Sequence, residues 1–258
     1  MSEELILVET SGPVARLTIQ RPKALNAINR AVLLELERAL TSVAESARVV
    51  VLTGSGEKAF VAGADIGEMA AFSATEARAF SALGHRVLRR LEELEAVTIA
   101  EVNGFALGGG CELMLACDFA IASENARLGQ PEVKLGVTAG FGGTTRLLRR
   151  IGRARAVQLL VTGEQIDAAE AARIGLVNEV VPREHLRPRV DAIAKAVVAN
   201  GPLAVSATKR AVRLAAEIDL ATANAYEQEI FGMCFATDDQ KEGMKAFLEK
   251  RPASWTAK

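Results

Sequence analysis

Two glutamates beside glycine-rich segments are the residues of this sequence best suited to chemistry. Glu112 follows Gly108-Gly109-Gly110 and Cys111 at the predicted start of a short helix. Backbone N–H groups at a helix start have no partner within the helix, so glycines here favour stabilisation of an oxyanion beside the carboxylate. The alternative is structural, because a glutamate in a first helical turn contributes about 0.3 to 1 kcal/mol and the glycines allow close packing.

The second glutamate, Glu132, lies in the segment GQPE at 129–132, and glycines follow it at positions 136, 140, 142 and 143. Such a loop can pass close to a ligand, although an exposed loop glutamate is the structural alternative. A third segment, AGADI at 62–66, consists mainly of small residues that let backbone N–H groups face a ligand. Together the three segments indicate a site built from carboxylates and main-chain donors.

Other catalytic motifs are missing from the sequence. The glycines of 104–110 lack the spacing GxGxxG, no GK[ST] follows a glycine run, and no GxSxG occurs. His85 and His185 lie in predicted helices without ligand-spaced partners, so no metal site is predicted. Cys111 and Cys117 lie in apolar surroundings typical of inert buried thiols, and Cys234 completes an odd number without CxxC spacing.

Composition excludes several broad classes. The 258 residues are 50% hydrophobic, which predicts one large globular domain or a core with a smaller appendage. With 31 basic and 32 acidic residues, the net charge of -1 provides no field for nucleic acid or an anionic membrane. The most apolar run, residues 113–122, is interrupted by Asp118, so no membrane span is predicted. Three unpaired cysteines and an acidic start favour a cytoplasmic protein.

The elements that must position these residues follow an α/β pattern. Residues 6–9 and 14–20 predict a hairpin, and residues 49–52, 97–102 and 119–123 predict strands. Helices are predicted at 29–46, 111–117 and 146–160, and a capping box of Ser73 and Glu76 opens a helix that runs to about residue 94. Residues 186–200, 203–217 and 220–235 and a last helix after Thr237 are helical, so we predict an α/β core at 1–195 and a helical region at 196–258.

These segments resemble the crotonase (enoyl-CoA hydratase/isomerase) family, and the resemblance extends along nearly the whole chain. It rests on the order and spacing of six pieces, namely RPKALNAI at 21–28, AFVAGADIGEM at 59–69, NGFALGGGCELMLACD at 103–118, GQPEVKLG at 129–136, GFGGTTRL from residue 140 and FATDDQKEGMKAFLEKR at 235–251.

The resemblance implies a fold, a substrate class and an assembly. The fold is α/β, a spiral of ββα units followed by a C-terminal helical region that serves oligomerisation and covers the active site. The substrate is a CoA thioester, so CoA is part of the substrate and no separate cofactor is expected. The expected assembly is a homotrimer or a dimer of trimers, with no membrane or nucleic-acid partner.

The resemblance also assigns roles to individual residues. The N–H groups of Ala64 and Gly109 would form an oxyanion hole on the thioester carbonyl, and Glu112 and Glu132 would hold a water between them with help from Gly140. Lys23 and, from a neighbouring subunit, Lys250 would meet the phosphates of CoA. The backbone that would enclose CoA lies near Ala24, Leu25, Ala62, Asp65 and Ile66. Ala139 stands where hydratases often have proline, which bears on acyl-chain specificity.

Addition of water to a 2-enoyl thioester is the reaction that these residues favour. The carbonyl oxygen gains negative charge in the transition state, where two fixed N–H donors act, and loss of one such donor costs about 2.7 to 4 kcal/mol. We expect Glu112 to be the base and Glu132 the acid, although sharing of both roles, or one glutamate handling both protons, stays open. The alternatives are a 3,2-enoyl-CoA isomerase, a branched or cyclic enoyl-CoA hydratase, and an RNA-binding homologue, which the neutral charge and 4% aromatic content disfavour.

Overall fold

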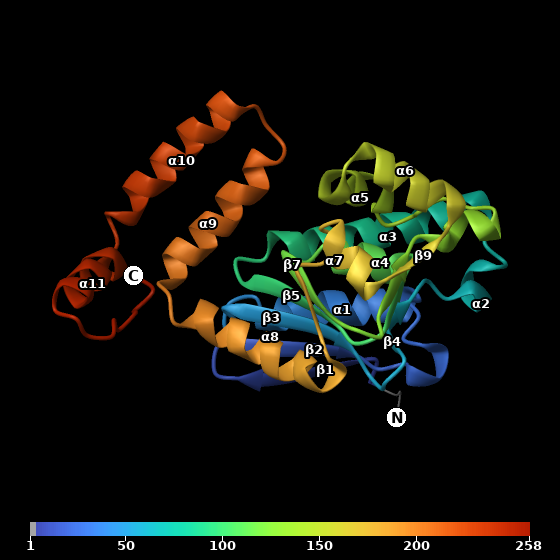
Figure 1. Ribbon diagram of the computed structural model, residues 1–258, viewed down its shortest axis with the longest axis horizontal. Helices are drawn as coiled ribbons and strands as arrows, with labels where there is room; N and C mark the ends of the chain where they lie inside the picture. The colour runs from blue at the N-terminus through green and yellow to red at the C-terminus, as the bar shows by residue number, and fades with distance from the viewer. Residues whose placement is uncertain (1–3) are drawn as a thin grey trace.

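The computed structural model describes residues 4–258 and contains two sheets surrounded by helices (Figure 1). The larger sheet has the order β1-β2-β3-β5-β7-β10, and its strands are β1 (Ile6–Ser11), β2 (Val14–Ile19), β3 (Val49–Gly54), β5 (Val97–Val102), β7 (Phe119–Ser123) and β10 (Glu179–Val181). The smaller sheet has the order β4-β6-β8-β9, with strands β4 (Ala59–Ala62), β6 (Phe105–Leu107), β8 (Arg127–Gly129) and β9 (Gln165–Asp167).

The larger sheet is mainly parallel and buried on both faces. The predicted hairpin is confirmed as the antiparallel pair β1 and β2, which turns at Gly12 with a φ of 56°. From β2 onward the neighbours pair in parallel. Every residue of β3 and β5 is buried, which explains why their sequences are almost continuously apolar rather than alternating.

The chain alternates between the two sheets as it winds. Each of β3, β5 and β7 in the larger sheet is followed directly by β4, β6 or β8 in the smaller one. In the smaller sheet Ala62 pairs with Leu107, and Leu107 pairs with Gly129. The residues that follow these three parallel strands therefore leave the sheet at the same edge, and they are the three segments singled out in the sequence.

Helices cover the sheets and complete the core. The predicted capping box at the start of α3 is confirmed, since Ser73 and Glu76 exchange hydrogen bonds there. α8 packs on the larger sheet, where Leu186 and Val190 join Val49 in a buried cluster. The helices of this part are α1 (Arg30–Val43), α2 (Ile66–Met69), α3 (Ala74–Glu93), α4 (Gly109–Leu115), α5 (Gly143–Ile151), α6 (Arg153–Thr162), α7 (Ala168–Arg173) and α8 (Arg183–Val198), with 3-10 turns η1 (Pro22–Ala24) and η2 (Pro131–Leu135).

The single helix predicted at 146–160 is wrong. The structure contains α5 and α6 in its place, separated at Gly152, whose φ of 78° and ψ of 161° are incompatible with a continuous helix. The short strands of the smaller sheet were not predicted either. With three or four residues each, they are too short for apolar alternation to distinguish them from loops.

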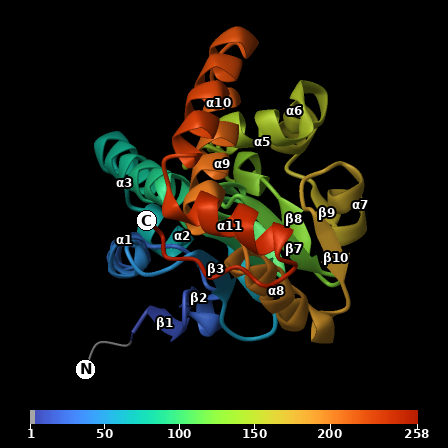
Figure 2. The ribbon, with the colours of Figure 1, turned by 90° about the vertical axis from the view of Figure 1, so that its left-hand side faces the viewer.

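The C-terminal helices extend away from the sheets. α9 (Pro202–Ala215), α10 (Leu220–Cys234) and α11 (Asp238–Leu248) form the end of the molecule opposite α2, and α10 stands clear of the sheets in the side view (Figures 1 and 2). The boundary predicted at residue 195 falls within α8, so the division into two parts stays a prediction. Within residues 4–258 no single helix is long and apolar enough to cross a membrane, whereas the bent pair α8 and α9 passes that test jointly.

Candidate active site

Residues 24–28 and residues 62–66 are joined by backbone hydrogen bonds. Ala62 N–H donates to the carbonyl of Leu25 at 3.0 Å, and Ile28 N–H donates to the carbonyl of Gly63 at 2.9 Å. Asp65 N–H in turn donates to the carbonyl of Ile28 at 2.7 Å. The segments 24–28 and 62–66 therefore form one rigid unit.

Two main-chain donors face the same space next to this unit. Gly109 is the first residue of α4, so its N–H has no partner within the helix. Among the loop and turn hydrogen bonds of residues 4–258, the N–H of Ala64 donates to no carbonyl. A Cβ placed on Gly109 would lie 3.6 Å from the Ala64 nitrogen, so the two donors are close neighbours. This arrangement suits a single oxyanion bound by two N–H groups.

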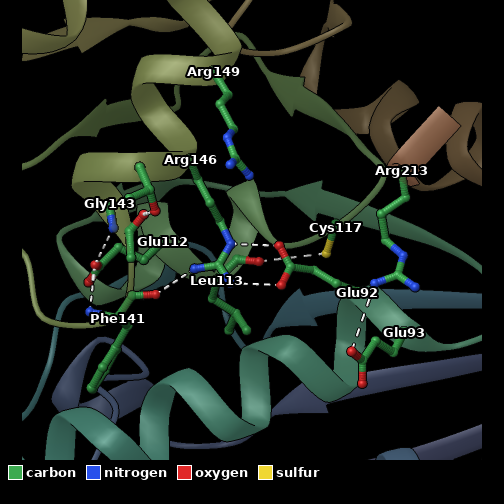
Figure 3. A network of polar contacts seen from close by, with 12 residues as sticks. Glu92, Glu93, Glu112, Leu113, Cys117, Phe141, Gly143, Arg146, Arg149 and Arg213 are labelled. Carbon is green, nitrogen blue, oxygen red and sulfur yellow. Dashed lines mark hydrogen bonds and ion pairs between the residues drawn. The ribbon is translucent and has the colours of Figure 1, made fainter. Parts of the chain in front are cut away.

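The Glu112 carboxylate is buried and held by backbone donors. The residue is 1% exposed, in the first turn of α4. Its Oε1 accepts hydrogen bonds from Phe141 N–H and Gly143 N–H, each at 2.7 Å (Figure 3). Both bonds go to the same oxygen, so the loop that contains Phe141 and Gly143 holds the carboxylate at Oε1.

Opposing effects act on the protonation of Glu112. Burial raises the pKa of this carboxyl, since a charge is costly to remove from water. The N–H groups of Gly143 and Phe141, the charge of Arg146 and the N–H of Gly140 each act to lower the pKa. The effect of burial is the largest, so the pKa of Glu112 is raised, and the N–H donors favour the anionic form that a general base needs.

Glu132 lies in η2, directly after β8, and faces α4. A Cβ on Gly108 would lie 3.1 Å from Glu132 Oε1, and the φ of 51° and ψ of -123° at Gly108 are restricted to glycine. With its amide nitrogen turned toward Glu132, the buried Gln130 donates to Oε1 at 2.8 Å and to Oε2 at 3.2 Å. Glycine at 108 therefore allows the carboxyl of Glu132 to approach the start of α4.

Burial and a neighbouring charge act on the protonation of Glu132. Burial raises the pKa of Glu132 to about 7, and the negative charge of Glu112 adds to the rise. The interaction places both carboxyl groups in one electrostatic site, where the first to ionise raises the pKa of the second. At neutral pH a large share of Glu132 is protonated and can donate a proton.

The unit expected to enclose CoA is stabilised from within. Leu25 and Asn26 both have positive φ, 51° and 60°, and the buried Asn26 amide donates to the carbonyls of Ser55 and Ala59 at 2.9 Å. The carboxylate of Asp65 binds Arg21 at 2.8 Å and caps α2. The side chain of Asp65 is therefore engaged within the protein, and so is its backbone, whose N–H donates to Ile28 and whose carbonyl accepts from Met69 N–H at 3.1 Å.

The remaining predicted site residues lie in several places. Lys23 and Ala24 lie in η1, and Lys23 lines a cavity of about 400 Å³ together with Leu25 and Lys58. Ile66, at the start of α2, is exposed. Lys250 follows α11 at the opposite end of the molecule from α2 (Figure 1). Within one chain the structure thus does not bring Lys250 to the other residues of the site.

A comparison with known protein families identifies the family of the chain. The sequence profile described as enoyl-CoA hydratase/isomerase matches residues 9–258. The chain belongs to the enoyl-CoA hydratase/isomerase family.

Individual members of the family are similar over their full length. A crotonyl-CoA hydratase of Syntrophomonas wolfei is 53% identical, with all of both chains covered, and a short-chain-enoyl-CoA hydratase of Clostridium acetobutylicum is 52% identical, with 95% of each covered. The crystal structure of an enoyl-CoA hydratase from Bacillus anthracis superposes with a TM-score of 0.96 at 40% identity, covering 98% of this chain and all of that one. The predicted family and its α/β fold are confirmed.

Three residues of this hydratase/isomerase site were not predicted from the sequence. Gln130 stood within the motif GQPE without a role of its own, although its amide contacts Glu132. Phe141 supplies an N–H to Glu112, and Arg146 donates to the carbonyl of Phe141 at 2.6 Å. A buried glutamine next to a candidate catalytic carboxyl is a signal that could have identified the first of them. The contacts of the other two depend on tertiary structure.

Proposed function

We propose that this protein is an enoyl-CoA hydratase that adds water reversibly across the C2=C3 bond of a short-chain 2-enoyl-CoA. The observation that carries the proposal is the pairing of two carboxyls, Glu112 and Glu132, with two adjacent N–H groups, those of Ala64 and Gly109. Burial raises the pKa of both carboxyls, that of Glu132 to about 7, and backbone N–H groups bind the Glu112 carboxylate. Two carboxyls in different hydrogen-bonding environments are typical of general acid and base roles.

The proposed reaction uses each group once. Glu112 accepts a proton from water as its oxygen attacks C3, and the electron pair of the double bond moves toward the thioester carbonyl. The N–H groups of Ala64 and Gly109 stabilise the resulting enolate oxygen. Glu132 then delivers a proton to C2, which gives 3-hydroxyacyl-CoA, and proton exchange with solvent restores both carboxyls.

The loss of the enoyl absorbance of crotonyl-CoA on addition of protein tests this proposal. We expect the Glu112→Gln and Glu132→Gln variants each to lower kcat by about 100-fold or more, since general acid–base catalysis contributes about 10² to 10⁴. Glu124→Gln is the matched control, because Glu124 is exposed in the turn after β7. Folded natural protein without activity on crotonyl-CoA, or conversion of 3-enoyl-CoA alone, would refute the hydratase assignment.

A row of aromatic rings supports the proposal that the acyl chain of the substrate is short. The ring of Phe141 is buried, and a Cβ on Gly109 would lie 3.3 Å from it, so the ring borders the proposed oxyanion hole. Phe141 contacts Phe80 edge to face at 5.3 Å between ring centroids, and Phe80 contacts Phe72 at 5.6 Å. We infer that these rings limit the space for the acyl chain.

The proposed preference for short acyl chains is tested by measuring kcat/KM with enoyl-CoAs of increasing acyl length. We expect the value to fall as the chain lengthens, and we expect Phe141→Ala to reduce that fall by opening the wall. The rate with crotonyl-CoA serves as the internal reference for the variant. A flat profile in the natural protein would contradict the short-chain assignment.

Exposed apolar side chains on the C-terminal helices support assembly into a homotrimer or a dimer of trimers. Phe247 and Leu248 of α11 are each 80% exposed, and Leu220 of α10 is 76% exposed. Such side chains are typical of subunit interfaces. In the proposed assembly, Lys250 of one subunit meets the CoA phosphates bound by the next. Light scattering after gel filtration should give the mass of three or six chains, and a monomer would refute the assembly.

A further inference from the structure

We propose that Arg146 is a positioning residue for Glu112, which it holds in place through the backbone of residues 140–143. The inference rests on the catalytic role proposed above for Glu112. It adds to that role a side chain that touches neither the substrate nor the carboxylate.

The first peptide unit of this loop is bonded on both sides. Phe141 N–H donates to Glu112 Oε1 at 2.7 Å, and the carbonyl of the same peptide unit, that of Gly140, accepts a hydrogen bond from Ser81 Oγ at 2.5 Å. A bond to the carbonyl polarises the unit and strengthens its N–H as a donor. Ser81 belongs to α3, so that helix fixes this unit from behind.

The third peptide unit is arranged in the same way. Gly143 N–H donates to Glu112 Oε1, and the carbonyl of that unit, that of Gly142, accepts from Thr145 Oγ1 at 3.0 Å and from Arg146 N–H at 2.9 Å. Residues at the start of α5 thus fix the peptide unit that contains Gly143 N–H, the first donor of this helix. Both N–H groups that reach Glu112 belong to units whose carbonyls are occupied.

The second unit, between these two, is held by the Arg146 side chain. Nη1 donates to the carbonyl of Phe141 at 2.6 Å, while Nε and Nη2 bind the two oxygens of Glu92 in α3 at 2.7 and 2.8 Å (Figure 3). The guanidinium is only 15% exposed. A planar fork with fixed donors makes all three bonds at once, whereas the single ammonium of lysine cannot reproduce this geometry. Arg146 therefore ties the loop to α3 at the point where the loop grips Glu112.

The positive charge of Arg146 also acts on the Glu112 carboxylate. The charged and titratable groups around Glu112 are Arg146 of α5, Glu132 of η2 and Cys111 of α4, and Glu92 and His85 of α3 lie behind Arg146. Burial and the charges of Arg146 and Arg89 lower the pKa of His85, which keeps that ring neutral at neutral pH. The positive charge of Arg146 lowers the pKa of Glu112 and so opposes the effect of burial.

The test compares Arg146→Gln, Arg146→Lys and Arg149→Gln in the full-length protein with crotonyl-CoA. Arg149 is the matched control, because it lies in the same helix and its guanidinium also pairs with a glutamate, Glu217, but both partners are about half exposed. For Arg146→Gln we expect kcat to fall by about 10- to 100-fold with little change in KM, since small displacements of a catalytic group have effects of this size. The acidic limb of the kcat/KM pH profile should move to higher pH, because the base loses a stabilising charge.

The two other variants separate charge from geometry. Arg146→Lys keeps the charge and should keep the acidic limb close to its natural position, with a kcat between those of natural protein and Arg146→Gln. Arg149→Gln should leave kcat and the limb unchanged.

The inference is overturned if Arg146→Gln leaves kcat unchanged, or if it lowers the melting temperature and kcat without moving the acidic limb, as a purely structural ion pair would. Glu112→Gln in the same series keeps the two proposals apart, because full activity of that variant refutes the role of Glu112 itself. Loss of activity in Glu112→Gln together with an unchanged Arg146→Gln profile refutes only the role of Arg146.

Discussion

Replacement of Glu132 by glutamine should stabilise the protein, and more so as the pH rises. The folded structure raises the pKa of this carboxyl from 4.5 to about 7, chiefly through burial. At about 1.36 kcal/mol per pH unit, this difference sets a ceiling of about 3 kcal/mol on the free energy of unfolding. Glu132 is partly exposed, so solvent screening reduces the expected effect to about 1 to 2 kcal/mol.

The direction of the pH effect follows from the proton that Glu132 retains in the folded state. Because the folded pKa is the higher one, the contribution of Glu132 to stability is complete below about pH 4.5 and is lost as the pH rises through about 7. Above that pH the folded protein holds a poorly solvated negative charge. Glutamine has nearly the same shape and never carries the charge, so the variant does not lose this stability as the pH rises.

Thermal unfolding at about pH 5 and about pH 8 measures the effect. The melting temperature of Glu132→Gln relative to natural protein should be higher at pH 8 than at pH 5 by about 3 to 6 °C, taking about 2 to 4 °C per kcal/mol for a chain of this size. Glu124→Gln should show no such pH dependence, and all samples need equal protein concentration because assembly shifts the melting temperature. An advantage at pH 5 that equals or exceeds that at pH 8 would refute the assigned protonation of Glu132.

Three further outcomes follow from the structure. Gly108→Ala should cost about 1 to 3 kcal/mol and lower kcat, as measured by thermal melting and the crotonyl-CoA assay, because its backbone is strained for alanine and the new Cβ would lie 3.1 Å from Glu132 Oε1. Glu101→Gln removes one of the two carboxylates that pair with the buried Arg16, the other being Asp191, and should cost about 1.5 to 3 kcal/mol in denaturant unfolding. Cys111 is buried and its thiol pKa is raised, so mass spectrometry should find it unmodified after alkylation of the folded protein.

The sequence was sufficient to predict those features that depend on local pattern. The capping box at Ser73 and the β1–β2 hairpin are confirmed, since their signals lie within a few neighbouring residues. The three segments could be singled out because each combines glycine or other small residues with a carboxylate within a few positions. That they leave one sheet edge together depends on the register between Ala62, Leu107 and Gly129, which no local pattern specifies.

Contacts between distant residues could not be predicted. Arg146 and Glu92 are 54 positions apart, and each is an ordinary charged residue of an amphipathic helix when considered alone. The end of α5 at Gly152 was missed because the residues on both sides continue the helical pattern of apolar side chains. A single glycine within such a pattern is often tolerated, so its extended backbone conformation had to come from the structure.

The different roles proposed for the two glutamates have one physical origin in the structure. Burial raises the pKa of both carboxyls, so burial alone does not distinguish them. The difference comes from hydrogen-bond donors, because Oε1 of Glu112 accepts two backbone N–H groups that the loop 140–143 fixes in place. Glu132 has the neutral amide of Gln130 beside it, which can accept a hydrogen bond from the protonated carboxyl or donate one to the anion. We therefore assign the base to the carboxyl that receives two N–H groups from the loop 140–143, and the acid to the carboxyl beside the Gln130 amide.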